Sequence, residues 1–126
     1  MLLNAFDYDR QAGKITNRRA IFETPDGLGV ADGMAIDIQD RLWVAFCGGW
    51  CVGCIDPASG QLLSKVAVPV GHVTACAFGG PELRDLYITT ARIGLDEAAL
   101  TEQPHAGDLF VARMDVPGVA PFRFCG

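Results

Sequence analysis

The strongest constraint on the fold is a pattern that occurs twice along the chain. Its first copy starts at Asp32 and ends with the run Leu42-Trp43-Val44-Ala45, and its second starts at Thr74 and ends with Leu86-Tyr87-Ile88-Thr89. The copies are 42 residues apart at their start and 44 at their end, because the turn in the second copy is longer. Four short strands repeated at roughly this period are typical of the blades of a β-propeller.

Short apolar or alternating runs, separated by turn residues, cover the whole chain and predict an all-β fold. We expect one domain over residues 1–126, a partial β-propeller of about two and a half four-stranded blades. Residues 33–68 form one blade, residues 73–124 form a second, and residues 1–23 supply the outer two strands of a preceding blade. A small antiparallel sandwich of roughly 8 to 10 strands is the alternative. The expected strands are 5–8, 19–22, 33–37, 41–46, 51–55, 62–68, 73–78, 85–90, 108–114 and 122–124, with a short helix at 95–100.

Composition argues against several classes of partner. Ten basic and 15 acidic residues give a net charge of −5, which disfavours nucleic acids and anionic membrane surfaces. The chain contains no run of about 18 apolar residues, so we expect no membrane span. Residues 1–7 lack the basic and apolar regions of a signal peptide. Five cysteines, an odd number, fit reduced thiols better than a disulfide framework, so we expect a cytoplasmic protein.

Asp32 is the main candidate for chemistry. It lies just before an expected strand and is followed by Gly33, so its carboxylate is held where it can meet a metal ion or a substrate. Thr74 occupies the equivalent position in the second copy of the pattern, where it would point towards the propeller axis and contact substrate. The alternative for Asp32 is a turn in which the carboxylate bonds nearby backbone N–H groups. A second pair, Asp26-Gly27, does not lead into a strand at the right spacing, and we interpret it as a loop.

The cysteines and histidines suggest packing rather than chemistry. Cys51 and Cys54 are three residues apart in an expected strand, so they face opposite sides of the sheet. We expect these thiols and that of Cys47 to pack as small apolar groups, and a metal or redox site is the alternative. His72 and His105 lie in loops, where we expect each to be solvated or bonded within a turn.

Seven stretches, taken in order, together resemble the SMP-30/gluconolactonase/LRE family of regucalcin-like lactonases. The family's full members are six-bladed propellers about twice as long as this chain, and the resemblance is to their C-terminal part. The stretches are Ala5-Phe6-Asp7-Tyr8-Asp9 with Gly13-Lys14-Ile15-Thr16-Asn17-Arg18-Arg19, Ala31-Asp32-Gly33-Met34-Ala35-Ile36-Asp37, Leu42-Trp43-Val44-Ala45 with Gly48-Gly49, Asp56-Pro57-Ala58-Ser59-Gly60, Thr74-Ala75-Cys76-Ala77-Phe78-Gly79-Gly80, Leu86-Tyr87-Ile88-Thr89-Thr90-Ala91 and Gln103-Pro104-His105-Ala106-Gly107-Asp108-Leu109-Phe110.

The resemblance implies a divalent metal on the propeller axis. Its ligands in the family are a Glu, an Asn and the Asp of a Pro-Asp-Gly-Met motif, which falls on Asp32, with Ala31 in place of the proline. We expect the Glu and the Asn to belong to blades outside this chain, because Asn4 and Asn17 lie beside outer strands, far from an axis. Oxygen ligands suit Ca²⁺, Mg²⁺ or Mn²⁺, and Zn²⁺ is also compatible.

The implied reaction is the hydrolysis of a small sugar lactone. The metal would polarise the ring carbonyl, and Asp32 would also accept a proton from the attacking water. Because only one of the family's ligands is present, we expect an incomplete centre that needs further N-terminal blades. The alternative is a non-catalytic half-propeller that binds partners or forms a homo-oligomer, since repeat units bury their faces only against neighbours.

Overall fold

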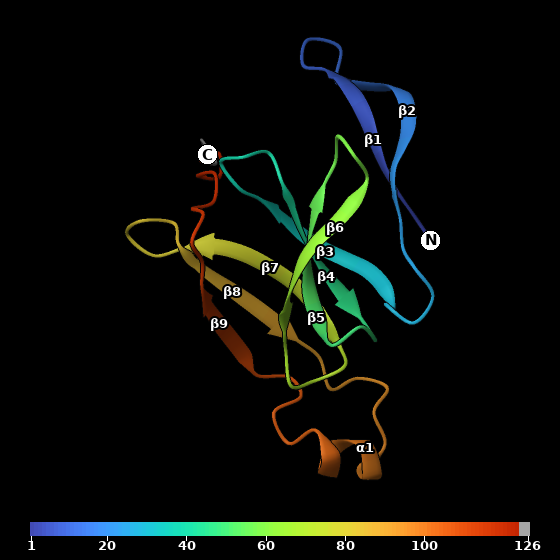
Figure 1. The fold of residues 1–126 in the computed structure, drawn as a ribbon, viewed down its shortest axis with the longest axis vertical. Helices are drawn as coiled ribbons and strands as arrows, with labels where there is room; N and C mark the ends of the chain where they lie inside the picture. Colours follow the sequence, from blue (N-terminus) through green and yellow to red (C-terminus); the bar gives the residue numbers. More distant parts are fainter. Residues whose placement is uncertain (124–126) are drawn as a thin grey trace.

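The structure is a computed structural model that describes residues 1–123. Its strands form three antiparallel sheets, which follow one another in sequence order (Figure 1). No helix in the described part is long and apolar enough to cross a bilayer. The elements are the ribbon of β1 (Leu2–Asp9) and β2 (Lys14–Glu23), the sheet of β3 (Val30–Ile36), β4 (Leu42–Cys47), β5 (Cys51–Asp56) and β6 (Gln61–Ala67), the sheet of β7 (Val73–Gly79), β8 (Asp85–Thr90) and β9 (Leu109–Arg113), and the helix α1 (Glu97–Glu102) between β8 and β9.

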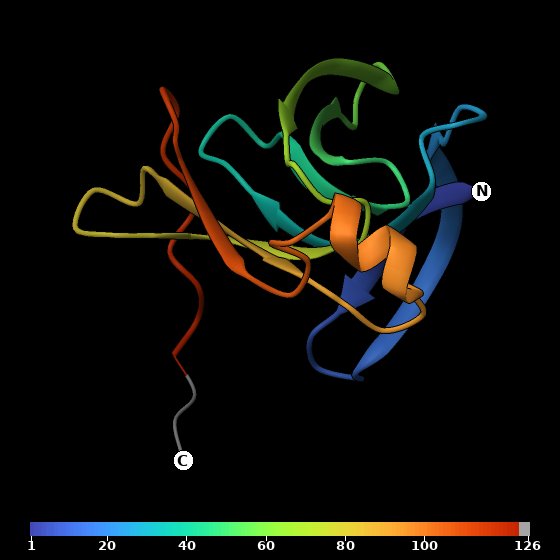
Figure 2. The ribbon, with the colours of Figure 1, turned by 90° about the horizontal axis from the view of Figure 1, so that it is seen from below.

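The sheets pack as successive blades of a partial β-propeller. β3 and β7 are edge strands of their sheets, and β7 packs against both β3 and β4. The β1–β2 ribbon lies on the other side of the four-stranded sheet, which is therefore the middle layer (Figure 2). The predicted all-β partial propeller is confirmed, while the assignment of residues 1–126 to a single domain stays a prediction.

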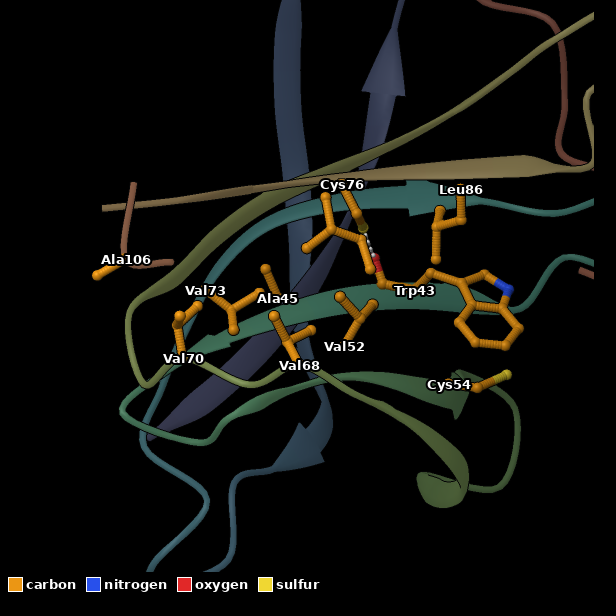
Figure 3. Packing of buried hydrophobic residues seen from close by; sticks show 11 residues of the cluster. Trp43, Ala45, Val52, Cys54, Val68, Val70, Val73, Cys76, Leu86 and Ala106 are labelled. Atoms are coloured by element: carbon orange, nitrogen blue, oxygen red, sulfur yellow. Dashed lines mark hydrogen bonds between the residues drawn. The ribbon is translucent and has the colours of Figure 1, made fainter. Parts of the chain in front are cut away.

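Two apolar clusters cover the two faces of the four-stranded sheet. The first, which includes Trp43 and Ala45, lies between this sheet and β7–β9 (Figure 3). The second includes Val44 and Phe46 and packs against Phe22 of β2. Successive residues of β4 thus enter different clusters, as the two-residue period of a strand requires. Because both faces are covered, β4 and β5 are apolar almost throughout.

The observed elements differ from the expected ones at several points: β1 and β2 are longer than the expected strands 5–8 and 19–22, and the sheet of β7–β9 has three strands among the described residues where four were expected. β3 begins at Val30, so Asp32 lies within the strand and not ahead of it. The helix begins two residues later than expected, because Asp96 caps it and so cannot belong to it. Residues 122 and 123 lie outside any strand, and residue 124 of the expected strand 122–124 is outside the described residues.

The chain beyond β9 connects the two larger sheets at the C-terminal end of β3. The Val119 N–H donates to the Ile36 carbonyl at 3.1 Å, and the Gly118 N–H donates to the Leu83 carbonyl at 2.8 Å. Gly118 also lies so close to the Phe78 ring that a Cβ atom would overlap it. A residue without a side chain is therefore required where this segment crosses between the sheets.

Asp37 organises the turn between β3 and β4. Its buried carboxylate accepts backbone N–H bonds from Gln39 at 2.8 Å and from Arg41 at 3.1 Å. It also accepts a 2.9 Å hydrogen bond from Nε1 of Trp43, the largest side chain of the first cluster. Burying a carboxylate is unfavourable unless such donors replace water, so this turn and the adjacent core depend on each other.

Replacing Asp37 with Asn is expected to lower the free energy of unfolding by about 1–3 kcal/mol, because one of the three N–H donors would face an amide NH2 group. Urea denaturation measures the loss. Asp40→Asn is the matched control in the same turn, since Asp40 is exposed and its positive φ of 59° is tolerated by Asn. Equal midpoints for the two variants would contradict the assigned role of Asp37.

Candidate functional site

Asp32 lies at a β-bulge in β3. The register of β3 with β4 shifts between Ala31 and Met34, so Asp32 and Gly33 together lie opposite a single residue of β4. A bulge of this kind bends the strand and changes the direction of the side chain at the extra residue. The side chain of Asp32 is exposed. Asp32 was expected just before the strand, but it lies at a bulge within the strand.

Thr74 lies at the corresponding bulge in β7. Val73 pairs with Thr90 and Ala75 pairs with Thr89, which leaves Thr74 as the unpaired extra residue. The hydroxyl of Thr74 is half-buried and lies 2.9 Å from the hydroxyl of Thr89. Asp32 and Thr74, which match in the sequence repeat, therefore also share a local backbone structure.

The two bulges meet at Gly33. A Cβ atom on Gly33 would lie 2.6 Å from the Cβ of Ala75, 2.8 Å from its Cα, and 3.0 Å from the carbonyl oxygen of Thr74. Real Cβ atoms do not approach other atoms this closely, so the contact between β3 and β7 requires glycine. Asp32 and Thr74 are the chain neighbours of the two contacting residues, so this contact brings the backbones of the two bulges close together.

The carboxylate of Asp32 is free to bind a ligand. Within residues 1–123 it has no hydrogen bond or ion pair with another residue. Nor does this part of the chain contain a group of three or more His, Cys, Asp and Glu side chains that could hold a metal ion. Asp32 can therefore supply one hard oxygen ligand or one proton acceptor.

Four connections lie at the end of the sheets that carries Asp32. Val30 pairs with Cys47, and Val73 pairs with Thr90, so the connections before β3 and β7 and after β4 and β8 share this end. The connection after β4 is residues 48–50, whereas the equivalent one after β8 is residues 91–108 and contains α1. This connection is the longest of the four, so it is the main structure at the end of the sheets that carries Asp32.

Residues 91–108 are held in place by side chains that no sequence motif identifies. The Gly71 N–H donates to Oε1 of the buried Gln103 at 2.7 Å. The Thr90 hydroxyl donates to the Asp108 carbonyl at 2.7 Å and accepts from the Gly107 N–H at 3.0 Å. Gln103 and the C-terminal end of this connection are thereby fixed to the end of the sheets.

The histidines and the second Asp-Gly pair do not join Asp32 in a cluster. Nδ1 of His105 lies 2.9 Å from the carboxylate of Asp108, so it is bonded within a turn, as expected. His72 is half-buried and pairs with Cys47 in an isolated bridge. Asp26 is exposed in a turn, which confirms the loop interpretation of Asp26-Gly27.

Three of the four described cysteines pack as apolar groups, whereas Cys47, for which the same was expected, is half-buried and belongs to neither cluster. Cys51 and Cys54 are buried in different clusters, on opposite faces of the sheet, as the sequence predicts. Burial raises the pKa of both thiols. Burial also raises the pKa of Cys76 to about 12, and its Sγ donates to the Trp43 carbonyl at 3.1 Å. These groups remain protonated thiols at neutral pH, which disfavours the alternative of a metal or redox site.

Comparison with known proteins identifies relatives over nearly the whole chain. The model of the family described as SMP-30/Gluconolactonase/LRE-like region matches residues 1–92. Regucalcin from Danio rerio is 44% identical over 126 residues, which cover 99% of this chain and 43% of the relative. Regucalcin from Bos taurus is 42% identical over 125 residues, covering 98% of this chain and 42% of the relative. The chain thus spans about two fifths of the length of these curated relatives.

Solved structures agree with this fold. A luciferin-regenerating enzyme superposes with a TM-score of 0.82 at 34% identity, covering 94% of this chain and 40% of that one. A calcium-binding protein, regucalcin, from Agrobacterium tumefaciens superposes with a TM-score of 0.85 at 28% identity, again covering 94% and 40%. The resemblance inferred from the seven stretches is confirmed.

Replacing Gly33 with Ala is expected to destabilise the protein by about 1–3 kcal/mol, because the new Cβ would overlap Ala75 and separate β3 from β7. Adding Ala75→Gly should recover part of this loss by removing the atom at 2.6 Å, while the Cα at 2.8 Å remains. Urea denaturation of the two single variants and the double variant measures the coupling. Strictly additive effects would contradict the contact.

Iodoacetamide labelling of the native protein should modify Cys51, Cys54 and Cys76 slowly, because burial limits access and raises their pKa values. Mass spectrometry of the peptides identifies each site, and the urea-denatured chain is the control. For Cys76 the thiolate fraction, and with it the rate, should keep increasing as the pH rises towards about 12. Equal rates in native and denatured protein would show that these thiols are not packed.

Proposed function

The chain belongs to the SMP-30/gluconolactonase/LRE-like family, and from this premise we propose that it forms part of a divalent-metal-dependent sugar-lactone hydrolase. One observation supports this proposal above all others. Asp32 presents an exposed carboxylate, without a partner in residues 1–123, at a bulge of an edge strand beside the matching bulge of β7. A carboxylate buried in a turn for structural reasons, such as Asp37, is saturated by N–H donors instead.

A divalent metal fits Asp32 as one ligand among several. Its carboxylate oxygens are hard donors that suit Ca²⁺, Mg²⁺ and Mn²⁺, and Zn²⁺ also accepts them. The relative from Agrobacterium tumefaciens is described as calcium-binding, which favours such a metal here. The described residues contain no group of three candidate ligands. The remaining ligands would therefore come from outside the described part of this chain, so Asp32 is proposed as a contributor and not as a complete site.

Asp32 and Thr74 would have different roles in the hydrolysis of a small sugar lactone. Asp32 accepts a proton from the water that attacks the ring ester, which is the role its free and exposed carboxylate suits. Thr74 contacts a substrate hydroxyl, since its hydroxyl bonds Thr89 and retains further capacity as donor or acceptor. A bound divalent cation would supply polarisation of the ester carbonyl.

We also propose that the protein is cytoplasmic. The four described cysteines, Cys47, Cys51, Cys54 and Cys76, are free thiols, which suits a reducing compartment. Net charge of −5 disfavours nucleic acids and anionic membranes as partners.

A second candidate function is that of a non-catalytic half-propeller, which acts as a binding or self-assembling module. The described residues contain no group of three or more candidate metal ligands, which is compatible with it. It is also favoured by the apolar side chains of Met34 and Ile36, which are exposed on β3, an edge strand of the four-stranded sheet. The two candidates differ in whether Asp32 affects turnover.

Replacing Asp32 with Asn is expected to reduce hydrolysis of a panel of sugar lactones by about 100-fold or more, because Asn cannot accept the proton. A pH-stat assay with added Ca²⁺, Mg²⁺, Mn²⁺ or Zn²⁺ measures turnover, and calorimetry measures binding of the same cations. Asp26→Asn is the matched control, since it alters the other Asp-Gly pair in an exposed turn.

The outcomes separate the two candidates. Loss of turnover and of cation binding in Asp32→Asn, but not in Asp26→Asn, supports the hydrolase. Full activity in Asp32→Asn contradicts the role of this carboxylate. Equal inactivity of the unaltered protein and both variants, with every cation, supports the non-catalytic candidate for this chain by itself.

A further inference from the structure

Cys47 differs from the other three described cysteines in its surroundings. Those three are buried within the apolar clusters, whereas Cys47 is half-buried and belongs to neither cluster. Cys76, for example, donates its thiol proton to the Trp43 carbonyl, but the thiol of Cys47 has no hydrogen-bond partner within residues 1–123. The burial that disfavours a redox site at the other thiols therefore does not apply to Cys47.

His72 lies directly opposite Cys47. The two residues form an isolated antiparallel bridge, and beside it the Gly48 N–H donates to the Gly71 carbonyl at 2.8 Å. Because the flanking residues make this bond, Cys47 and His72 are a non-hydrogen-bonded pair, the kind of pair whose side chains lie closer together. Their Cβ atoms are then about 4.5–5.5 Å apart on one face. A thiol and an imidazole are thus neighbours at the end of β4.

Two contacts from the connection that contains α1 hold His72 in this position. The Ala91 N–H donates to the His72 carbonyl at 2.9 Å, and a Cβ atom on Gly94 would lie 3.9 Å from Cε1 of the imidazole. In the described part of the chain, neither ring nitrogen of His72 has a hydrogen bond or an ion pair. Nδ1 of His105, in contrast, is bonded within its own turn. The imidazole of His72 is therefore free to accept a proton.

The pair lies where the four-stranded sheet meets the sheet of β7–β9. Ala45, two residues before Cys47 on β4, is buried in the cluster between these sheets, so the side chain of Cys47 points to the same face. Both sheets lie within the described residues. The access to Cys47 is therefore a property of this junction and not of a sheet that lacks a neighbour.

We propose that Cys47 is a site of thiol–disulfide exchange with small disulfides, in which His72 accepts the proton of the thiol. The thiolate attacks one sulfur of the disulfide, so that an S–S bond to Cys47 forms as the original S–S bond breaks. The other half leaves as a thiolate and takes the proton that His72 holds. The small disulfide is the oxidant, and one thiol and one disulfide are present before and after the step. A neighbouring imidazole favours the thiolate, which is the nucleophile. The proposal does not depend on whether Asp32 is catalytic.

Oxidised glutathione at neutral pH is the probe, and mass spectrometry of peptides from the full chain gives the rate of modification at each cysteine. Cys47 is expected to react about tenfold faster in the native protein than in the urea-denatured chain, because only the folded chain sets His72 beside it. The three buried thiols are expected to react more slowly in the native protein. Cys125 lies outside the described residues, so the measurement is repeated with Cys125→Ser to exclude transfer from that thiol.

His72→Asn is expected to lower the native rate at Cys47 by about tenfold, because an amide cannot take the proton. His105→Asn is the matched control and should leave this rate unchanged, since His105 bonds within its own turn. Circular dichroism checks that both variants are folded. A native rate at Cys47 equal to or below its rate in urea would overturn the proposal, and so would an unchanged rate in folded His72→Asn. The comparison of native and denatured rates needs no variant, so it decides the matter even if His72→Asn fails to fold.

Discussion

The close contact between β3 and β7 is the constraint on which the rest of the structure depends. Gly33 lets the two strands approach until its Cα lies against Ala75. This approach brings the sheets together over the first apolar cluster and sets the two bulges side by side. A side chain at Gly33 would separate the strands, and with them the core and the pair Asp32 and Thr74. Stability and the candidate chemistry are thus linked through one glycine.

The layered β fold could be predicted because its cause, the pattern of apolar residues, is present in the sequence. β4 and β5 are apolar on both faces since both faces are covered, and the repeat marks corresponding strands. The bulges could not be predicted, because in so short a strand the phase change that one extra residue makes in the two-residue alternation cannot be told from an irregular pattern. Nor could the role of Asp37: an Asp in a turn is usually exposed, and only the folded chain shows the indole of Trp43 bonded to it.

The candidate site was predicted as Asp32 with Thr74, and the roles of both residues stay a prediction. The repeat pairs Asp32 with Thr74, and the structure shows their chain neighbours Gly33 and Ala75 in contact. It does not bring other candidate metal ligands to Asp32 within the described residues. The chain spans about two fifths of the length of its curated relatives. Apolar side chains of the edge strand β3 and of β8 and β9 are exposed. An unfinished site and uncovered faces have the same physical origin, namely blades that have no neighbour within residues 1–123.

The central claim is that Asp32 and Thr74 lie side by side at one end of the sheets, where Asp32 can hold a divalent cation. Paramagnetic broadening by Mn²⁺ in amide NMR spectra of the full chain tests it most directly. The account predicts that substoichiometric Mn²⁺ broadens the signals of β3 around Asp32 and of β7 around Thr74 together. Broadening centred on the exposed Asp7 or Asp26, or on β3 without β7, would contradict it.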